Sequence, residues 1–177
     1  MHLEFLKRKV QGQEIIKDAV CNIESELQEI IAEVRALSRR LRPSILDDFG
    51  LIPALDQLFE QYQKSTEVQL RSQLIEPSNR YSSKTEVAIY RIVQEAINNA
   101  VRHGNSSIIW VHLAAKKNNT ELLIRDNGEG FDPIIKKPGH GLKNIRERTE
   151  SIGGQYEMNS RKGKGTQIKV VIPNCYV

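Results

Sequence analysis

The stretch Asp126-Asn127-Gly128-Glu129-Gly130-Phe131 decides how the rest of this sequence is interpreted. It follows an apolar run, Leu122 to Ile124, of the kind that forms a buried strand. A carboxylate at a strand end can accept a hydrogen bond from an exocyclic amine, and glycines let the backbone approach a planar ligand closely. Because Asp-Asn-Gly is also a frequent turn sequence, the stretch alone leaves two alternatives, a base-binding loop and a plain turn.

A second polar set lies on a predicted helix from Ser83 to His103, which stops at Gly104. Glu95, Asn99 and Arg102 follow one another at helical spacing, so their side chains project from one side of that helix. Carboxylate and amide oxygens suit Mg²⁺, which keeps several waters and bridges substrate phosphates. The alternative interpretation is a solvated polar face without a ligand.

Two glycine-rich stretches follow the first one. Gly139-His140-Gly141-Leu142 opens a predicted helix, where free backbone amides form an anion site and glycines let a phosphate approach. Gly163-Lys164-Gly165-Thr166 joins two predicted strands, 155–160 and 166–172. Taken alone, each of these stretches is also an ordinary tight turn.

The apolar pattern elsewhere predicts the other elements of an α+β domain. It predicts helices over 51–64 and 142–152, strands near 68–74, over 108–113 and over 121–125, and a mobile lid over 131–138. Together these elements form a mixed sheet with one face covered by helices.

In order and spacing, the four stretches resemble the ATP-binding domain shared by sensor histidine kinases, DNA gyrase, the Hsp90 chaperone and MutL. Within this superfamily, the sequences of the motifs are most similar to those of histidine kinases of the nitrate-sensor type. The resemblance covers roughly residues 20–173. It implies a two-layer α/β sandwich with a mixed sheet, the Bergerat-type ATP-binding fold, with ATP and Mg²⁺ as its ligands.

The resemblance also implies a role for each matching residue. Asp126 binds the adenine, Asn99 is a Mg²⁺ ligand, and Glu95 is the catalytic acidic residue that polarises a water or the metal shell. Arg102 and His103 face phosphate, and Thr166 bonds near Asp126. The glycine boxes and the lid hinge, which contact the nucleotide, are Gly128, Gly130, Gly139, Gly141 and Leu142.

The N-terminal region carries a two-position heptad seam. Its positions are Ile16, Ile23, Ile30 and Leu37, interleaved with Val20, Leu27, Val34 and Leu41. So narrow an apolar stripe indicates either a helix that packs on its own domain or a long dimerisation helix in a bundle. The following run, LRPSILDDFGLIPAL from Leu41, resembles the segment that joins dimerisation helices to the kinase domain. We therefore expect residues 1–65 to be the end of a helical dimerisation region, giving a homodimer, and residues 66–177 to be the ATP-binding domain.

Composition excludes several classes of protein. The net charge is +4, the basic and acidic residues are interspersed, and no aromatic residues interleave with basic ones, so nucleic acid is not an expected partner. The two cysteines, Cys21 and Cys175, lack ligand-like spacing and are expected to be reduced thiols in the cytoplasm. No apolar run is long enough to span a bilayer, so membrane attachment is expected only through segments upstream of residue 1.

The resemblance implies transfer of the ATP γ-phosphoryl group to a histidine and then to an aspartate of a response regulator. None of His2, His103, His112 and His140 fits the acceptor, which is expected to lie before residue 1, so this fragment is not expected to phosphorylate itself. Two alternatives stay open: a non-catalytic dimeric nucleotide-binding regulatory module and an anti-sigma-factor serine kinase. The heptad helix and its junction argue against the serine kinase.

Overall fold

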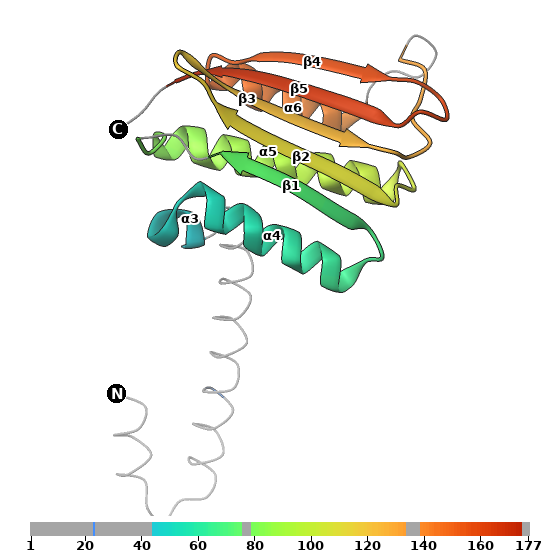
Figure 1. Cartoon of the computed structure of the whole chain (residues 1–177), viewed down its shortest axis with the longest axis horizontal. Coiled ribbons are helices and arrows are strands. Elements are labelled where there is room, and N and C mark those ends of the chain that lie inside the picture. Colours follow the sequence, from blue (N-terminus) through green and yellow to red (C-terminus); the bar gives the residue numbers. More distant parts are fainter. Residues whose placement is uncertain (1–22, 24–43, 76–78, 134–138, 175–177) are drawn as a thin grey trace, which may run out of the picture. The chain divides into compact units, whose positions relative to one another are not determined.

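The computed structural model describes Ile23 and residues 44–75, 79–133 and 139–174. The chain divides into two compact units, Met1–Ser44 and Ile45–Val177. The elements in chain order (Figure 1) are α3 (Ser44–Phe49), α4 (Leu51–Ser65), β1 (Gln69–Ile75), α5 (Ser83–Arg102), β2 (Ile108–Ala115), β3 (Asn119–Asp126), α6 (His140–Ser151), β4 (Gln155–Ser160) and β5 (Thr166–Pro173).

The five strands form one mixed sheet in the order β1-β2-β3-β5-β4. Strands β1 and β2 are parallel, and the other three neighbouring pairs are antiparallel. A parallel pair needs a crossover, and α5 supplies it on the same side of the sheet as α6 (Figure 1). The predicted α+β class, a mixed sheet with helices on one face, is confirmed.

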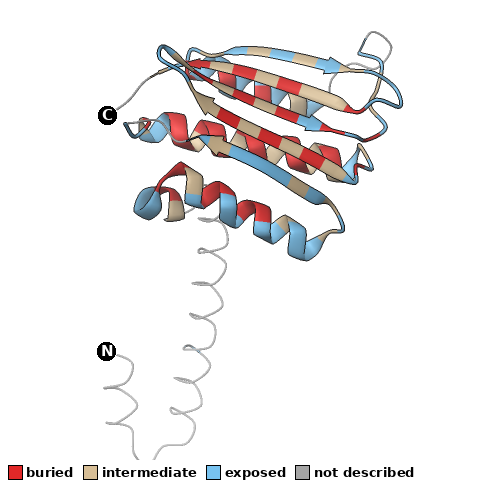
Figure 2. Ribbon diagram, viewed as in Figure 1, coloured by how far each residue is buried: buried red, intermediate tan, exposed pale blue. Residues whose placement is uncertain are grey.

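The core lies between the sheet and its helices because each inner strand alternates buried and half-buried residues (Figure 2). The register places Val111 opposite Ile124 and Leu113 opposite Leu122, and all four side chains are buried. Helix α5 covers them with an almost continuously buried face that includes Ile89, Val93, Ala96, Ile97 and Ala100.

Helix α5 begins at Ser83, as predicted, and the residue before it forms the N-cap. The N-cap is Ser82, whose hydroxyl accepts the backbone N–H of Thr85 at 3.3 Å. The buried carboxylate of Glu86, in the first turn, accepts from Arg80 Nε at 2.9 Å and from Arg80 Nη2 at 3.0 Å. The same Nη2 donates to the carbonyl of Leu46 in α3.

Helix α4 shares the core of the sheet domain. Its buried residues Leu51, Ala54, Leu55, Leu58 and Phe59 belong to one cluster with those of α5 and the sheet. The division of the chain at residue 65 stays a prediction. Within the described residues, however, α4 packs on α5 and β1.

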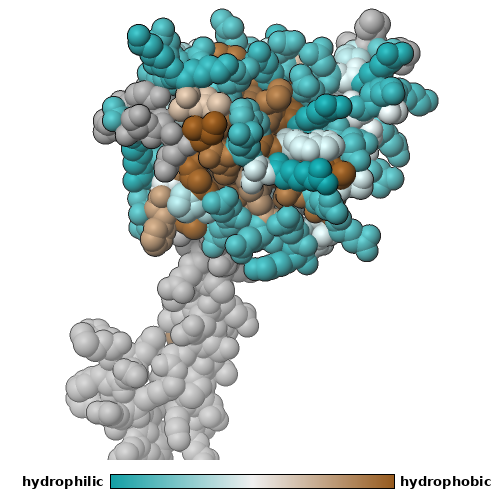
Figure 3. Space-filling model, in the orientation of Figure 1, coloured by the Kyte–Doolittle hydropathy of each residue, from teal (hydrophilic) through white to brown (hydrophobic). Residues whose placement is uncertain are grey.

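The outer face of the sheet shows hydrophobic side chains in its middle with hydrophilic ones around them (Figure 3). The strand register puts Arg71, Trp110 and Arg125 in one row, and the Arg125 guanidinium lies 5.7 Å from the Trp110 ring centroid. An aromatic residue therefore does lie between basic ones in space, although the sequence separates them. The absence of a nucleic-acid partner remains a prediction.

Several predicted features fall outside the described residues: the heptad seam apart from Ile23, lid residues 134–138, and both cysteines. Ile23 is helical and exposed. Among the described residues, no helix has the length and apolarity to cross a bilayer.

The packing of α4 can be tested with Leu55→Ala. Leu55 is fully buried, so its truncation should lower the free energy of unfolding by about 2–5 kcal/mol, measured by denaturant titration. Gln57→Ala, at an exposed position of the same helix, is the matched control and should change stability by less than about 0.5 kcal/mol. Equal effects of the two substitutions would show that α4 is not part of this core.

Candidate functional site

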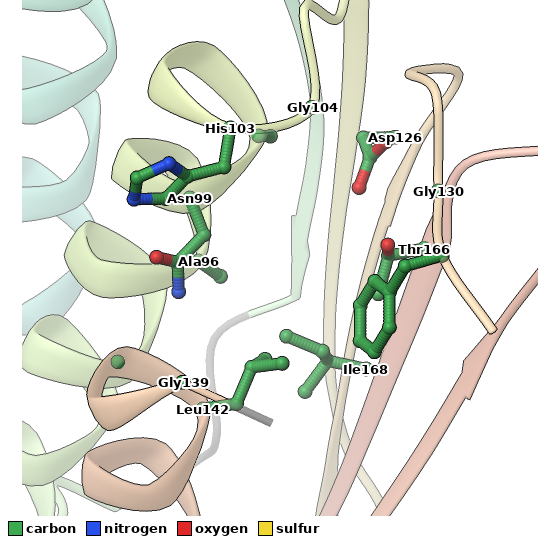
Figure 4. A pocket seen from close by; sticks show the side chains of 13 residues that line it. Ala96, Asn99, His103, Gly104, Asp126, Gly130, Gly139, Leu142, Thr166 and Ile168 are labelled. Atoms are coloured by element: carbon green, nitrogen blue, oxygen red, sulfur yellow. The ribbon is translucent and has the colours of Figure 1, made fainter. Parts of the chain in front are cut away.

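A cavity of about 260 Å³ lies between the C-terminal half of α5, the first turn of α6 and the adjoining ends of β3 and β5 (Figure 4). It is lined by Ala96, Asn99, Ala100, His103, Gly104, Asp126, Gly130, Phe131, Gly139, Gly141, Leu142, Thr166 and Ile168. Most of the predicted site residues are therefore brought together around one cavity. Glu95, Arg102 and Gly128 are the predicted residues that do not line it.

Asp126 is the last residue of β3, and its side chain is held in one orientation. The residue is only 7% exposed, and its Oδ1 accepts both the backbone N–H of Gly128 at 2.8 Å and the hydroxyl of Ser106 at 3.0 Å. Among the described residues, no donor reaches Oδ2. The carboxylate thus has one oxygen occupied by the protein and one available to a ligand in the cavity.

Gly128 lies behind Asp126 instead of on the cavity wall. A Cβ at this position would be 2.2 Å from the carbonyl oxygen of Gly104, so only glycine permits this approach of two loops. The backbone N–H of Glu129 donates to the same carbonyl at 2.7 Å. Gly128 thus has a packing role and does not line the cavity, whereas Gly130 does line it. The nucleotide contact of Gly128 stays a prediction.

Asn99 presents an amide to the cavity from the last turns of α5. Its Nδ2 is buried and has no hydrogen-bond partner within the part of the chain that the structure describes. The oxygen and nitrogen of an amide have nearly the same shape, so either end can face a ligand. A buried amide without a protein partner, beside a half-buried Glu95 one turn earlier, fits a cation site that is completed by a bound ligand.

Gly141 brings the start of α6 against these two side chains. A Cβ on Gly141 would lie 2.3 Å from Oε1 of Glu95 and 2.8 Å from Oδ1 of Asn99. The predicted anion site is the first turn of this helix, where Gly139 is the N-cap residue and Gly141 and Leu142 line the cavity. The residues predicted for phosphate and for metal therefore adjoin each other.

Arg102 lies outside the cavity for a geometric reason. Each helical residue turns by about 100°, so Asn99 and His103 share the row that faces the cavity, whereas Arg102 falls in the row of Glu95 and Asn98. That row borders Tyr62 of α4, whose hydroxyl donates to Asn98 Oδ1 at 2.7 Å. Burial raises the pKa of the Tyr62 phenol, and the charge of Arg102 partly opposes this rise.

Thr166 lines the cavity at the start of β5, close to Asp126 (Figure 4). Its hydroxyl shares a hydrogen bond of 3.0 Å with Ser160, which also accepts the backbone N–H of Phe131 at 2.9 Å. A bond from Thr166 to Asp126 is not found among the described residues, so its role near the adenine stays a prediction. The preceding Gly165 makes the closest approach, since its Cβ would lie 2.0 Å from the Asp126 carbonyl oxygen.

Sequence reasoning missed the residues that give the cavity its small and apolar walls. These are Ala96, Ala100, Gly104, Phe131 and Ile168. The signal for Ala96 and Ala100 was present, because they continue the helical row of Asn99 and His103 with side chains small enough to leave space. No local pattern marks Ile168, which alternation only assigns to the inner face of its strand.

Residues 84–175, more than half of the chain, match the family described as "Histidine kinase-, DNA gyrase B-, and HSP90-like ATPase". The chain belongs to this family. The resemblance found in the sequence is thereby confirmed, and membership implies ATP as the ligand of the domain.

Two curated relatives show the extent of the match. The chain is 35% identical over 144 residues to "Signal transduction histidine-protein kinase/phosphatase DegS" of Brevibacillus brevis, covering 81% of this chain and 37% of that protein. It is 33% identical over 177 residues to "Oxygen sensor histidine kinase NreB" of Staphylococcus carnosus, covering 98% of this chain and 50% of that protein. The chain thus spans half or less of the length of these curated relatives.

Among solved structures, the fold is similar to the histidine kinase domain of a blue-light activated histidine kinase from Erythrobacter litoralis. The TM-score is 0.63 at 16% identity, and the match covers 97% of this chain and 93% of that one. At this identity the likeness supports the fold alone.

The contact between α6 and the polar edge of α5 can be tested with Gly141→Ala. The added methyl would collide with the ends of two flexible side chains, so stability should change by no more than about 1 kcal/mol. Glu95 and Asn99 would have to turn away, so the affinity for ATP should fall about tenfold, measured by calorimetry.

Gly139→Ala is the matched variant, because a Cβ there meets no atom of the described residues within 4 Å. We expect a clearly smaller loss of ATP affinity from this change. Equal losses for the two variants would contradict the importance of the contact between α6 and α5.

Proposed function

We propose that this chain is the ATP-binding catalytic domain of a two-component sensor histidine kinase, with the end of its dimerisation region. The observation that carries the proposal is that Asp126 and Asn99 line the same cavity from opposite sides (Figure 4). A base-binding carboxylate and a metal-binding amide separated by one cavity suit a nucleotide with its phosphates. The two curated relatives described above are histidine kinases, which supports the same conclusion.

In this proposal, the adenine amine donates to Oδ2 of Asp126, and the ring lies between apolar residues such as Leu142 and Ile168. The phosphates lie at the first turn of α6, where backbone amides and the helix dipole favour negative charge. His103 is the exposed cavity residue next to Asn99 and can contact a phosphate. The phosphate contact of Arg102 stays a prediction, because Arg102 does not line the cavity and its charge acts on Tyr62 of α4.

Asn99 and Glu95 are the residues that would hold Mg²⁺. Among the described residues, no cluster of three His, Cys, Asp or Glu side chains could hold a metal by itself. This fits a cation that takes most of its ligands from phosphate and water, as Mg²⁺ does. When bound, Mg²⁺ would neutralise charge on the β- and γ-phosphates during transfer.

The proposed reaction moves one phosphoryl group twice. An imidazole nitrogen of an acceptor histidine attacks the γ-phosphorus, a P–N bond forms, the bond to the β-phosphate oxygen breaks, and ADP leaves. A carboxylate oxygen of a response-regulator aspartate then takes the phosphoryl group from the histidine, which regains its free nitrogen. The described residues contribute by positioning the nucleotide and stabilising its charge.

The remaining parts of the proposal concern the whole protein. We propose that the acceptor histidine is supplied by a segment outside this chain, that the N-terminal helices form a homodimer, and that the domain works in the cytoplasm with a response regulator. The heptad seam of the sequence and the similarity to histidine kinases support these points.

Asp126→Asn tests base recognition. Two donors, from Ser106 and Gly128, converge on the Oδ1 position, so the amide oxygen of asparagine must occupy it and the amide NH₂ must face the cavity. That NH₂ would oppose the adenine amine, and ATP affinity should fall by at least about tenfold to a hundredfold in calorimetry. If the variant binds ATP as tightly as the parent, the assignment of this carboxylate is wrong.

Complementation tests the activity itself. The chain is mixed with a separate fragment that carries an acceptor helix, together with Mg²⁺ and ATP labelled on the γ-phosphate. We expect acid-labile phosphohistidine on the fragment with the parent chain, and none with Asn99→Ala. Bound nucleotide without any label would favour the alternative, a non-catalytic regulatory module.

A further inference from the structure

Ser106 lies on the turn between α5 and β2 and is only 6% exposed. Its hydroxyl donates to Oδ1 of Asp126 at 3.0 Å. Among the described residues, this is the single hydrogen bond of the Ser106 hydroxyl. Ser106 was not among the predicted site residues, yet its buried side chain contacts the carboxylate that is proposed to bind the base.

Two glycines make the space in which this hydroxyl sits. A Cβ at Gly128 would lie 2.4 Å from Ser106 Oγ, and a Cβ at Gly104 would lie 2.9 Å from it. Neither position could carry a larger residue without displacing the hydroxyl. The turn after α5 and the loop after β3 are therefore shaped around the contact between Ser106 and Asp126.

The two segments are held together by other bonds that do not involve the Ser106 hydroxyl. Asn127 Oδ1 accepts the backbone N–H groups of Ser107 at 3.0 Å and Ile108 at 2.9 Å, and Glu129 donates its N–H to Gly104 at 2.7 Å. These hydrogen bonds hold the turn and the loop together without the Ser106 hydroxyl. The hydroxyl itself contacts only the carboxylate of Asp126 among the described residues.

We infer that Ser106 is a positioning residue for base recognition, which occupies Oδ1 of Asp126 so that Oδ2 faces the ligand as an acceptor. A carboxylate fixed in this way accepts a hydrogen bond from a base that carries an exocyclic amine, and it gains nothing from a base that lacks one. The inference rests on the proposed function, because it concerns the same nucleotide. It adds that Ser106 contributes to the preference for a base that carries an exocyclic amine, as adenine does, over one that lacks it.

The test compares two ligands that differ by one group: ATP, and purine riboside triphosphate, whose base has hydrogen in place of the amine. Ser106→Ala should weaken ATP binding by about tenfold, the usual effect of losing a hydrogen bond to a charged group. Binding of the amine-free nucleotide should fall less than about twofold, because it does not use Oδ2. The preference of the parent protein for ATP should therefore shrink in the variant.

Ser107→Ala is the matched control, because it removes a hydroxyl from the same turn that faces Asn127 and not Asp126. We expect it to keep both affinities and the preference for ATP. Calorimetry reports on folded molecules, and a melting curve for each variant confirms that they are folded.

If Ser106→Ala lowers the affinities for the two nucleotides equally, the hydroxyl has only a structural role. This result would overturn the inference and leave the proposed function intact. Unchanged binding of both nucleotides would overturn it as well. If the parent protein binds neither nucleotide, the proposed function fails, and the inference fails with it.

Discussion

The site depends on the seating of the loop after β3 against the turn after α5. Gly128 lies against the carbonyl of Gly104, and Asn127 caps two backbone amides of the turn. This contact fixes the end of α5 relative to the end of β3. Since Asn99 belongs to that helix and Asp126 to that strand, the same contact sets the distance across the cavity between the two residues that the proposed nucleotide would bridge.

The opposite end of α5 is fastened by a different kind of interaction. Glu86 is buried and forms two hydrogen bonds with Arg80, which also reaches the Leu46 carbonyl of α3. A buried carboxylate without this partner would be strongly destabilising. The pair therefore holds together α3, the loop that carries Arg80 and the start of α5. Helix α5 is thus held at both ends, by charge at its start and by close backbone packing beyond its end.

Much of the fold was predictable from the sequence, because strand alternation and helical spacing are local. The pattern of α5 and the strand pair β2 and β3 gave the correct elements, and the four polar and glycine-rich stretches gave most of the cavity. Helical spacing alone does not say which of two adjacent rows lines a cavity, so the position of Arg102 outside it was not predictable. Nor does a sequence reveal that the backbone of Gly104 occupies the space beside Gly128.

Other features were beyond prediction because they depend on contacts between distant segments. Ser106 meets Asp126 only after β2 and β3 pair, and Trp110 meets the two arginines only through the strand register. For α4, the sequence showed the apolar stripe of the helix. It did not show which surface the stripe packs against.

The crowding around Gly128 and Gly165 has a consequence for how such domains change during evolution. Neighbouring backbone requires both glycines whatever the cavity contains. A Cβ on Gly128 would lie 2.2 Å from the carbonyl oxygen of Gly104, and a Cβ on Gly165 would lie 2.0 Å from that of Asp126. A descendant that lost the carboxylate, and with it any use for a nucleotide, would still be selected to keep these glycines in order to fold. In a diverged copy of this domain, the two glycines would therefore indicate only common ancestry. Nucleotide binding would be indicated only by the polar side chains at the positions of Asp126 and Asn99.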